Sequence, residues 1–203
     1  MEKPNQPRRT QTERSRESRE KILLAATEFF SRHGFNNAVM KEIAEAANLT
    51  LPGLLHHFPN KNTLLMAVLA ERDKANRGRF MADQDRGKTD PIEPFARLVE
   101  YNETVPGMVQ LFTVLVAESL QEQHPAHPFF IERYQTARAE YLDLLKKAQQ
   151  RGEVRDDIPA GDLFTMVFAM MDGLQIQWLL QPEKVNMAKV FRQFVALLRK
   201  PSR

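Results

Sequence analysis

The sequence contains no cysteine among its 203 residues. This absence excludes disulfide bonds, thiolate metal sites and cysteine nucleophiles, and it fits a reducing compartment. The N-terminus lacks the apolar run of a signal peptide, and no apolar stretch approaches the roughly 20 residues of a membrane span. We therefore expect a soluble, cytoplasmic protein that does not use a membrane, with enough hydrophobic residues (42%) for a real core.

Motifs of enzymes and metal sites are also missing. The sequence has no Gly-x-Ser-x-Gly, His-Glu-x-x-His or Walker pattern. His124 and His127 lie among prolines with only Glu122 nearby, and the adjacent His56 and His57 cannot point at one ion from a helix. We predict that the protein is not an enzyme and holds no metal or cofactor.

No stretch alternates apolar and polar residues over a strand length, so no sheet is expected. Helical periodicity dominates instead, interrupted by proline and glycine. The predicted fold class is all-α with about nine helices: four lie in the first 77 residues, and the others span about 91–104, 107–123, 127–151, 160–180 and 184–199.

The stretch from residue 40 to residue 58 contains two short helical patterns joined by a tight turn. Asn48 occupies the stop of the first pattern, because asparagine tolerates the left-handed conformation there. Thr50 can cap the second helix, and Pro52 suits its first turn. The predicted core positions are Met40, Ile43, Ala44, Ala47, Leu54, Leu55 and Phe58. This arrangement is typical of a helix-turn-helix, whose second helix reads the DNA major groove.

Further helices surround this motif. Before it, an apolar stripe that starts at Ile22 predicts a helix ended by Gly34, with Phe35 as a plug of the same core. After it, Asn60 can cap a fourth helix whose start would offer Lys61 and free amides to an anion.

Positive charge is concentrated near the N-terminus. Residues 1–61 hold ten Lys/Arg against seven Asp/Glu, while the rest holds nineteen of each. This excess either marks a domain that meets phosphate or arises by chance. Residues 1–18 carry several arginines and no large apolar side chain beyond Met1, so we predict a disordered arm that either follows a DNA groove or only improves solubility.

Residues 19–69 resemble the DNA-binding domain of the TetR family of bacterial transcriptional regulators. The matching residues are Ile22, Ala26, Phe30, Gly34, Phe35, Ile43, Ala44, Leu49, Thr50, His57, Phe58 and Lys61. The resemblance implies a homodimer with a three-helix head, a connecting fourth helix and a larger helical body that binds a small molecule and dimerises.

Two residues depart from the family pattern. Val39 stands where the family usually has threonine, and Leu55 stands where it usually has tyrosine, so two usual phosphate contacts are missing. The third helix also has no Arg, Asn or Gln for a bidentate base contact, which favours shape readout. The predicted DNA-contacting residues are Lys41, Thr50, Leu51, Pro52, Gly53, His56, His57 and Lys61.

The C-terminal part suggests a pocket. The helix from Met108 to Leu120 is apolar nearly all round, so we expect it at the centre of its domain. Its methionines and aromatics, like those of the other helices, form either core or the wall of a cavity. Pocket candidates are Phe95, Met108, Phe112, Glu118, Tyr134, Met166, Met170, Asp172 and Trp178, with Phe168, Met171, Gln110, Gln175 and Arg133 as further wall or anchor residues.

The last two helices are predicted to form a dimer interface. Gly173 would allow close helix approach, and the last helix carries more apolar surface than one domain end needs. A two-fold dimer would also pair the recognition helices. The interface candidates are Gly173, Ile176, Phe191, Phe194, Val195 and Leu198.

These features predict a ligand-responsive regulator with a DNA-binding domain at 19–61 and a ligand-binding and dimerisation domain at 62–203, in which 62–77 is the connector. The resemblance implies as partners a double-stranded DNA operator, a second copy of the chain and a small hydrophobic or amphipathic effector. Release of a repressor from its operator is the commoner habit of the family, and the sequence leaves open whether the effector releases the DNA or promotes binding. Residues 69–72 would lie near the point of transmission. The alternative is a helical binding or scaffold protein whose head no longer recognises DNA.

Overall fold

The computed structural model describes residues 10–81 and 90–200, apart from the side chains of residues 80 and 81. Within these residues the fold is all-α, as predicted, with one isolated bridge between Val154 and Arg199. The helices are α1 (Gln11–Asn37), α2 (Met40–Ala46), α3 (Leu51–His57), α4 (Lys61–Asn76), the π-helix η1 (Arg77–Met81), α5 (Glu93–Glu103), α6 (Pro106–Glu118), α7 (His127–Gln150), α8 (Ala160–Leu180) and α9 (Met187–Leu198).

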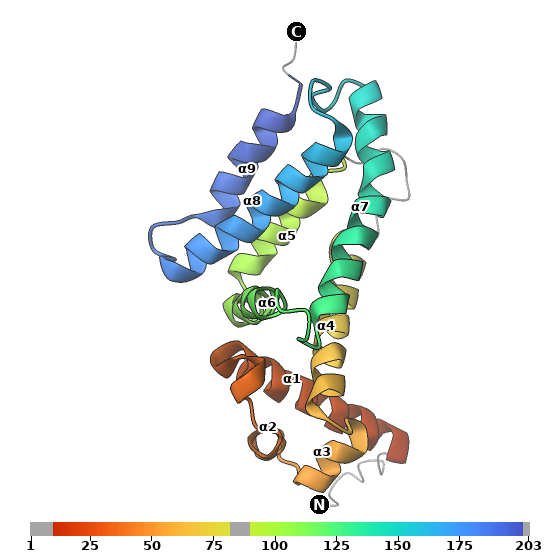
Figure 1. Cartoon of the computed structure of the whole chain (residues 1–203), viewed down its shortest axis with the longest axis vertical. Coiled ribbons are helices and arrows are strands. Elements are labelled where there is room, and N and C mark those ends of the chain that lie inside the picture. Colours follow the sequence, from red (N-terminus) through yellow and green to blue (C-terminus); the bar gives the residue numbers. More distant parts are fainter. Residues whose placement is uncertain (1–9, 82–89, 201–203) are drawn as a thin grey trace, which may run out of the picture.

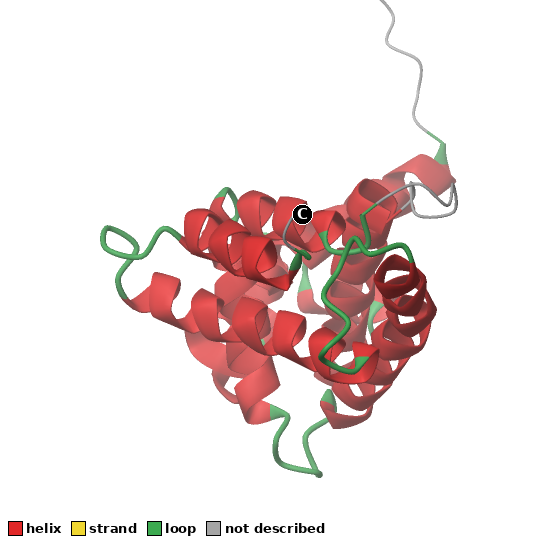
Figure 2. Cartoon of the chain, turned by 90° about the horizontal axis from the view of Figure 1, so that it is seen from above, coloured by secondary structure: helices red, strands yellow, loops and turns green. Residues whose placement is uncertain are grey.

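The molecule is elongated. Figure 1 shows α1, α2 and α3 at one end, α5, α8 and α9 at the other, and α4 and α7 running between the two ends. In the end-on view of Figure 2 the described chain is drawn entirely as helix and loop. We call α1 to α3 the head and α5 to α9 the body.

The first helix begins earlier than the composition predicts. Residues 1–9 of the expected disordered arm lie outside the described residues, but residues 11–18 are helical, so the prediction of disorder is wrong for them. Thr10 caps this helix, because its Oγ1 accepts a hydrogen bond from the N–H of Glu13 while the Glu13 carboxylate accepts one from the N–H of Thr10. Exposed ion pairs one turn apart extend the helix without apolar burial.

The remaining helix ends of the head lie where the sequence predicts them, at residues with special backbone or capping roles. Gly34 has φ 71° and ψ 169°, which breaks the helical path within α1. Asn48 has φ 57° in the turn of the helix-turn-helix. The Thr50 hydroxyl accepts from the N–H of Gly53 at 3.2 Å and caps α3. Asn60 caps α4 with the carbonyl of its side chain, as expected.

The hydrophobic core of the head continues into two helices of the body. Its buried side chains continue from α1 to α4 into Leu111, Phe112 and Leu115 of α6 and Phe130 of α7. Val109, on another side of α6, belongs to the body core. The expectation that α6 lies at the centre of the body is therefore wrong: this helix is apolar all round because it packs against α1 on one side and against α5 and α8 on others.

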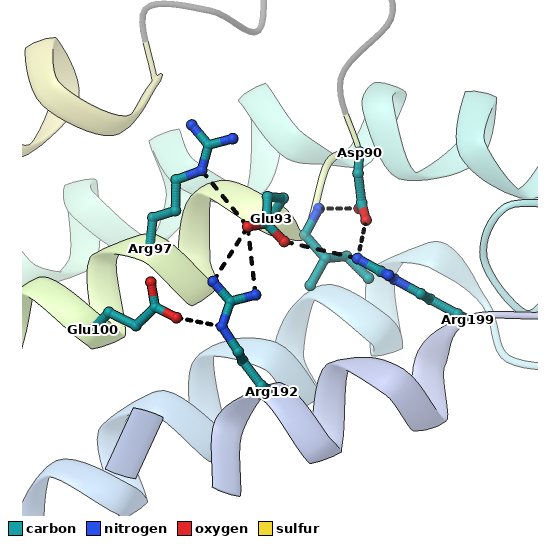
Figure 3. Close-up of polar contacts among 7 residues, drawn as sticks. Asp90, Glu93, Arg97, Glu100, Arg192 and Arg199 are labelled. Atoms are coloured by element: carbon teal, nitrogen blue, oxygen red, sulfur yellow. Dashed lines mark hydrogen bonds and ion pairs between the residues drawn. The ribbon is translucent and has the colours of Figure 1, made fainter. Parts of the chain in front are cut away.

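The body core joins α5, α7, α8 and α9. An arginine of α9 and the arginine that follows this helix fasten it to α5 and to the segment just before α5, as Figure 3 shows. Arg192 bonds to Glu100 and reaches Glu93, and Arg199 Nη2 lies 2.7 Å from Asp90 Oδ2. The hydrogen bond from Arg192 holds the pKa of the Glu100 carboxyl below its usual range. These contacts are exposed, so we expect them to fix the position of α9 along α5 and to add little to the stability of the protein.

Helix α8 qualifies the prediction on membrane spans. It is 21 residues long and, by length and composition only, apolar enough to cross a membrane. Many of its side chains lie in the body core between α7 and α9, which is the other reason for a helix to have this composition.

The helical segment after the head is longer than the predicted connector helix over residues 62–77. Residues 77–81 continue the helical path as the π-helix η1. Residues 82–89, between this segment and the predicted helix at about 91–104, lie outside the described residues.

Candidate DNA-binding surface and ligand pocket

Helix α3 is short and has one fully buried side chain, Leu54, so its other side presents an outer face. Pro52 and His56 are exposed on it, as the sequence predicts, while Leu51 and Gly53 are half-buried. Leu55 is also exposed, although the sequence predicts it in the core. This seven-residue helix, held through a single fully buried anchor, therefore leaves Pro52, Leu55 and His56 exposed to meet a partner.

Basic and imidazole groups border this face. Lys41 is exposed on α2, 3.9 Å from Glu45. His56 and His57 pack edge to face with ring centroids 5.5 Å apart. Burial, and then the neighbouring charges of His56 and Arg19, lower the pKa of His57. His57 is therefore biased toward the neutral form.

Lys61 is not the free cation that the sequence suggests. Its Nζ donates to the backbone carbonyls of Asn36 at 2.9 Å and Ala38 at 3.1 Å and lies over the Phe35 ring. These bonds tie the start of α4 to the end of α1, so the side chain has a structural task in the head.

A carboxylate on α6 joins the head to the body. Glu118 Oε2 accepts a hydrogen bond from the N–H of Phe35 at 3.1 Å. Its Oε1 would lie 2.6 Å from a Cβ added at Gly34. His124 lies on the other side, with Nε2 3.6 Å from Glu118 Oε2 and the ring edge-on to Phe35. Glu118 therefore takes its polar partner from the head rather than from a ligand.

A pocket of about 320 Å³ lies between α4, α5, α7 and α8. Two ion pairs form its polar wall: Asp73 Oδ1 lies 2.5 Å from Arg133 Nη1, and Glu140 Oε1 lies 2.5 Å from Arg77 Nη1. Its lining residues are Asp73, Asn76, Arg77, Phe95, Leu98, Phe129, Glu132, Arg133, Thr136, Ala137, Glu140, Tyr141, Phe168 and Met171. The apolar and aromatic share suits an organic ligand.

Behind this wall lies Arg72, a charged residue in the core. Its Nη1 is 3.6 Å from the Asp73 oxygen that also pairs with Arg133. Its guanidinium carbon lies 3.7 Å from the centroid of the Phe112 ring, and that of Arg133 lies 4.8 Å from the same centroid. Burial, and then repulsion from Arg133, lowers the pKa of Arg72 to about 9.

A second polar pair adjoins the two arginines. The Tyr134 hydroxyl donates to Asp172 Oδ2 at 2.8 Å. Burial raises the pKa of Asp172, and the bond from Tyr134 and the charges of Arg133 and Arg72 oppose this rise. The network thus joins α4, α6, α7 and α8 beside the pocket.

Comparison with known proteins decides the family. Residues 22–68 match the model of bacterial regulatory proteins of the tetR family, and residues 102–200 match that of the C-terminal part of BetI-type transcriptional repressors. The chain belongs to the TetR family. It is thus a transcriptional regulator of the DNA-binding, helix-turn-helix type, and its family is one of regulators and not of enzymes.

Relatives of this TetR-family chain match nearly its whole length. The regulator TtgR of Pseudomonas putida is 28% identical over 189 residues, which are 89% of this chain and 88% of TtgR. A regulator from Saccharomonospora viridis, solved in complex with choline, superposes with a TM-score of 0.72 and 24% identity over 92% of this chain and 100% of its own. The SmeT–triclosan complex superposes with a TM-score of 0.73 and 18% identity over 91% of this chain and 93% of its own.

The TetR-family body brings only part of the predicted pocket together. Phe95, Phe168, Met171 and Arg133 line it, and Phe112, Tyr134 and Asp172 form the network behind its wall. The other predicted residues do not line this pocket. Met166 and Gln110 are exposed, while Met170, Gln175 and Trp178 pack within the body. Met108 packs on the head core, and Glu118 accepts a hydrogen bond from the N–H of Phe35. Helical periodicity identifies a buried face but not which part of it meets a cavity.

Several lining residues were missed by the sequence reasoning. These are the polar residues of α4 and α7 and some apolar neighbours, namely Asp73, Asn76, Arg77, Leu98, Phe129, Glu132, Thr136, Ala137, Glu140 and Tyr141. In a sequence, a partly exposed polar residue on a helix has the same appearance whether it faces a pocket or bulk water.

The predicted dimer residues divide between the core and the surface. Phe191, Val195 and Leu198 are buried in the body core, so they are not free to form an interface. Gly173 and Phe194 are half-buried and Ile176 is 49% exposed. An exposed apolar stripe instead follows α8 and α9 at helical spacing, through Met166, Ala169, Gly173, Ile176 and Leu180 and through Val190, Phe194 and Leu197.

Proposed function

We propose that this TetR-family protein is a cytoplasmic repressor that releases its operator when a small hydrophobic or amphipathic molecule enters the body. The observation that carries the proposal is the shared core: α4 and α6 pack with the DNA-binding head, and the same two helices carry Asp73 and Phe112 at the pocket and its network. A ligand that moves these helices therefore moves the head. Residues 19–61 act as the head domain and residues 62–203 as the ligand-binding and dimerisation domain.

Operator contact is assigned to the exposed face of the helix-turn-helix. Pro52, with half-buried Leu51 and Gly53, offers apolar contact to base edges such as the thymine methyl, and His56 offers hydrogen bonding. Phosphate contact comes from Lys41, Thr50, His57, the third N–H of Lys61 and helix-end amides. Val39 is exposed and makes no side-chain cap on α2, as the sequence predicts. Because α3 has no Arg, Asn or Gln for a bidentate base contact, DNA shape and phosphate contact carry much of the specificity.

The names of the repressor model and of the two ligand complexes support the switch. For a tenfold change in operator affinity, the effector must favour one state of the dimer by about 1.4 kcal/mol. This demand is small for a buried organic ligand.

The dimer forms through the exposed stripe of α8 and α9. Replacing Leu197, which is 71% exposed, with glutamate is expected to convert the dimer to a monomer, because two-fold symmetry would bury two carboxylates at one apolar contact. Sedimentation velocity measures the change. The control is Leu24→Glu on α1, which removes an equally exposed leucine (75%) outside the stripe and should leave the dimer intact. Two variants with the same mass would place the interface elsewhere.

Sequence-specific DNA binding tests the function. The protein is titrated by fluorescence anisotropy against a duplex from the region upstream of its own coding sequence and against a shuffled duplex, at two salt concentrations. Tight binding to the first duplex alone, with a steep salt dependence and two protomers per site, is expected. Equal, weak binding to both duplexes, repeated across fragments of the genome, would favour a helical binding protein whose head no longer reads DNA.

A further inference from the structure

The charges around the pocket are unequally satisfied. Asp73 pairs with Arg133, and Glu140 pairs with Arg77. Arg72 is 7% exposed, and its Nε and Nη1 are buried without a hydrogen-bond acceptor. Its Nη1 has only an ion-pair contact, 3.6 Å from Asp73 Oδ1, an oxygen that lies closer to Arg133 and also lacks a hydrogen bond. A guanidinium presents five N–H donors and no acceptor, so a buried one with free donors calls for an acceptor group from elsewhere.

The position of Arg72 decides what can supply that acceptor. Asp73 and Arg133 line the pocket, and Arg72 lies next to them without lining it. Arg72 Nη1 is 3.6 Å from Asp73 Oδ1, the oxygen that also pairs with Arg133. Its flank is occupied by the Phe112 ring, which attracts a cation but accepts no conventional hydrogen bond. An anionic group that enters between Asp73 and Arg133 would meet both guanidiniums at once.

We propose that the pocket takes an aromatic effector that carries a carboxylate or a similar anionic group, and that Arg72 and Arg133 bind this group in place of Asp73. This inference rests on the proposed function, because it names the chemical class of the effector. The aromatic wall of Phe95, Tyr141 and Phe168 receives the apolar part. Charge-assisted hydrogen bonds to guanidinium are among the strongest a ligand can make in a protein.

A cationic effector fits the same wall less well. The carboxylates Asp73 and Glu140 each have an arginine partner already, and Glu132 is exposed at the rim, where water screens it. A cation would have to displace an arginine from its carboxylate and would leave the donors of Arg72 without an acceptor. An anion also displaces a partner, Asp73, from Arg133, but it brings an acceptor to the Arg72 donors that have none.

The same exchange would move the connector. Arg72 and Asp73 are consecutive residues of α4, so an anion that draws Arg72 forward while it displaces Asp73 changes how α4 rests on α7. Because α4 also carries Leu64, Leu65, Val68 and Leu69 of the head core, this change reaches the head.

Calorimetry with three naphthalene probes of one shape tests the ligand class in the full-length protein. 2-Naphthoate is anionic, 2-naphthamide is neutral and 2-naphthylmethylammonium is cationic. We expect 2-naphthoate to bind at least about tenfold more tightly than either of the others. Tighter or equal binding of the ammonium or the amide, or no binding of any probe at millimolar concentration, overturns the proposal.

Two variants with opposite expected effects identify the anchor. Arg72→Met should weaken 2-naphthoate binding about tenfold or more and leave the amide unchanged, because only the anion uses the guanidinium. Asp73→Asn should tighten 2-naphthoate binding about threefold or more, because it removes the competing carboxylate. A role in folding alone would weaken all probes in both variants.

Arg97→Met on the exposed face of α5 is the matched control and should change no affinity. Unchanged 2-naphthoate binding in Arg72→Met would overturn the assignment. Operator binding by the same preparations is measured in parallel without probe. If it is intact while the probes fail, only the ligand class is wrong; if it is absent, the proposed function itself is wrong.

Discussion

Gly34→Ala is expected to lower the free energy of unfolding by about 2–5 kcal/mol and to weaken operator binding. At φ 71° and ψ 169°, Gly34 occupies a region that is nearly restricted to glycine, where another residue costs about 1–3 kcal/mol. The added Cβ would also lie 2.6 Å from Glu118 Oε1. The carboxylate must then turn away from the N–H of Phe35, which loses a charge-assisted bond worth about 1–3 kcal/mol. Urea unfolding at fixed protein concentration measures the loss.

Gly152→Ala is the control for a positive φ without a steric contact. Gly152 has nearly the same φ, 72°, but nothing lies within 4 Å of an added Cβ. We expect a loss of only about 1–2 kcal/mol and no change in operator affinity. Glu118→Ala completes a double-mutant cycle with Gly34→Ala: their costs should be less than additive by about 1–3 kcal/mol, because the single carboxylate carries the contact. Additive costs would show that Glu118 does not couple the head to α6.

Phe112→Ala is expected to destabilise the protein by about 4–7 kcal/mol, the largest effect of any single side chain discussed. The ring is 3% exposed in the head core, so its truncation costs about 3–5 kcal/mol as lost burial and cavity. Its contacts with the guanidiniums of Arg72 and Arg133 add about 1–2 kcal/mol in this desolvated place. Both cations would lose the surface that holds them beside the pocket.

Phe112→Leu separates the two contributions, since leucine keeps most of the apolar burial and removes the aromatic face. Phe130→Leu is its control: this ring is 4% exposed in the same cluster and lies 5.0 Å from Phe112, but no cation–π contact is found for it among the described residues. We expect Phe112→Leu to cost about 1–2 kcal/mol more than Phe130→Leu in urea unfolding. Equal costs would mean that the arginines gain nothing from Phe112.

The head could be predicted from sequence because its design is local. Asn48 at the turn, Thr50 at the start of α3 and Asn60 at the start of α4 each act on backbone groups within three residues, and the structure confirms all three. Such signals depend on residue type and spacing alone. The all-α class follows from periodicity for the same reason.

Long-range packing produced the errors. Periodicity correctly marks Phe191, Val195 and Leu198 as one apolar stripe, but that stripe covers the body core, and the exposed stripe is the one through Leu197. Helix α6 has no polar face because two domains share it, which composition alone cannot distinguish from a central position.

The sequence contained one indication of the pocket that the sequence analysis did not use, the position of Arg72 in α4. Arg72 continues the buried spacing of Leu65, Val68 and Leu69 along α4, so a permanently charged side chain stands at a core position. Such a residue must find partners or serve a ligand. Its partners are Asp73, the next residue of α4, and Phe112 of α6, and Arg133 of α7 shares the Asp73 carboxylate; only the tertiary structure brings Phe112 and Arg133 to this place.

We expect pocket occupancy and operator affinity to be coupled through α4, α6 and the core that they share with the head. The direct measurement is a pair of titrations, operator against protein with and without saturating pocket ligand, and ligand against protein with and without operator. The ligand is 2-naphthoate or, if it fails, a compound found by thermal-shift screening and mapped to the pocket with Phe168→Ala. We predict that each partner weakens the other by the same factor, about tenfold or more. Equal affinities in both pairs of titrations would contradict the account.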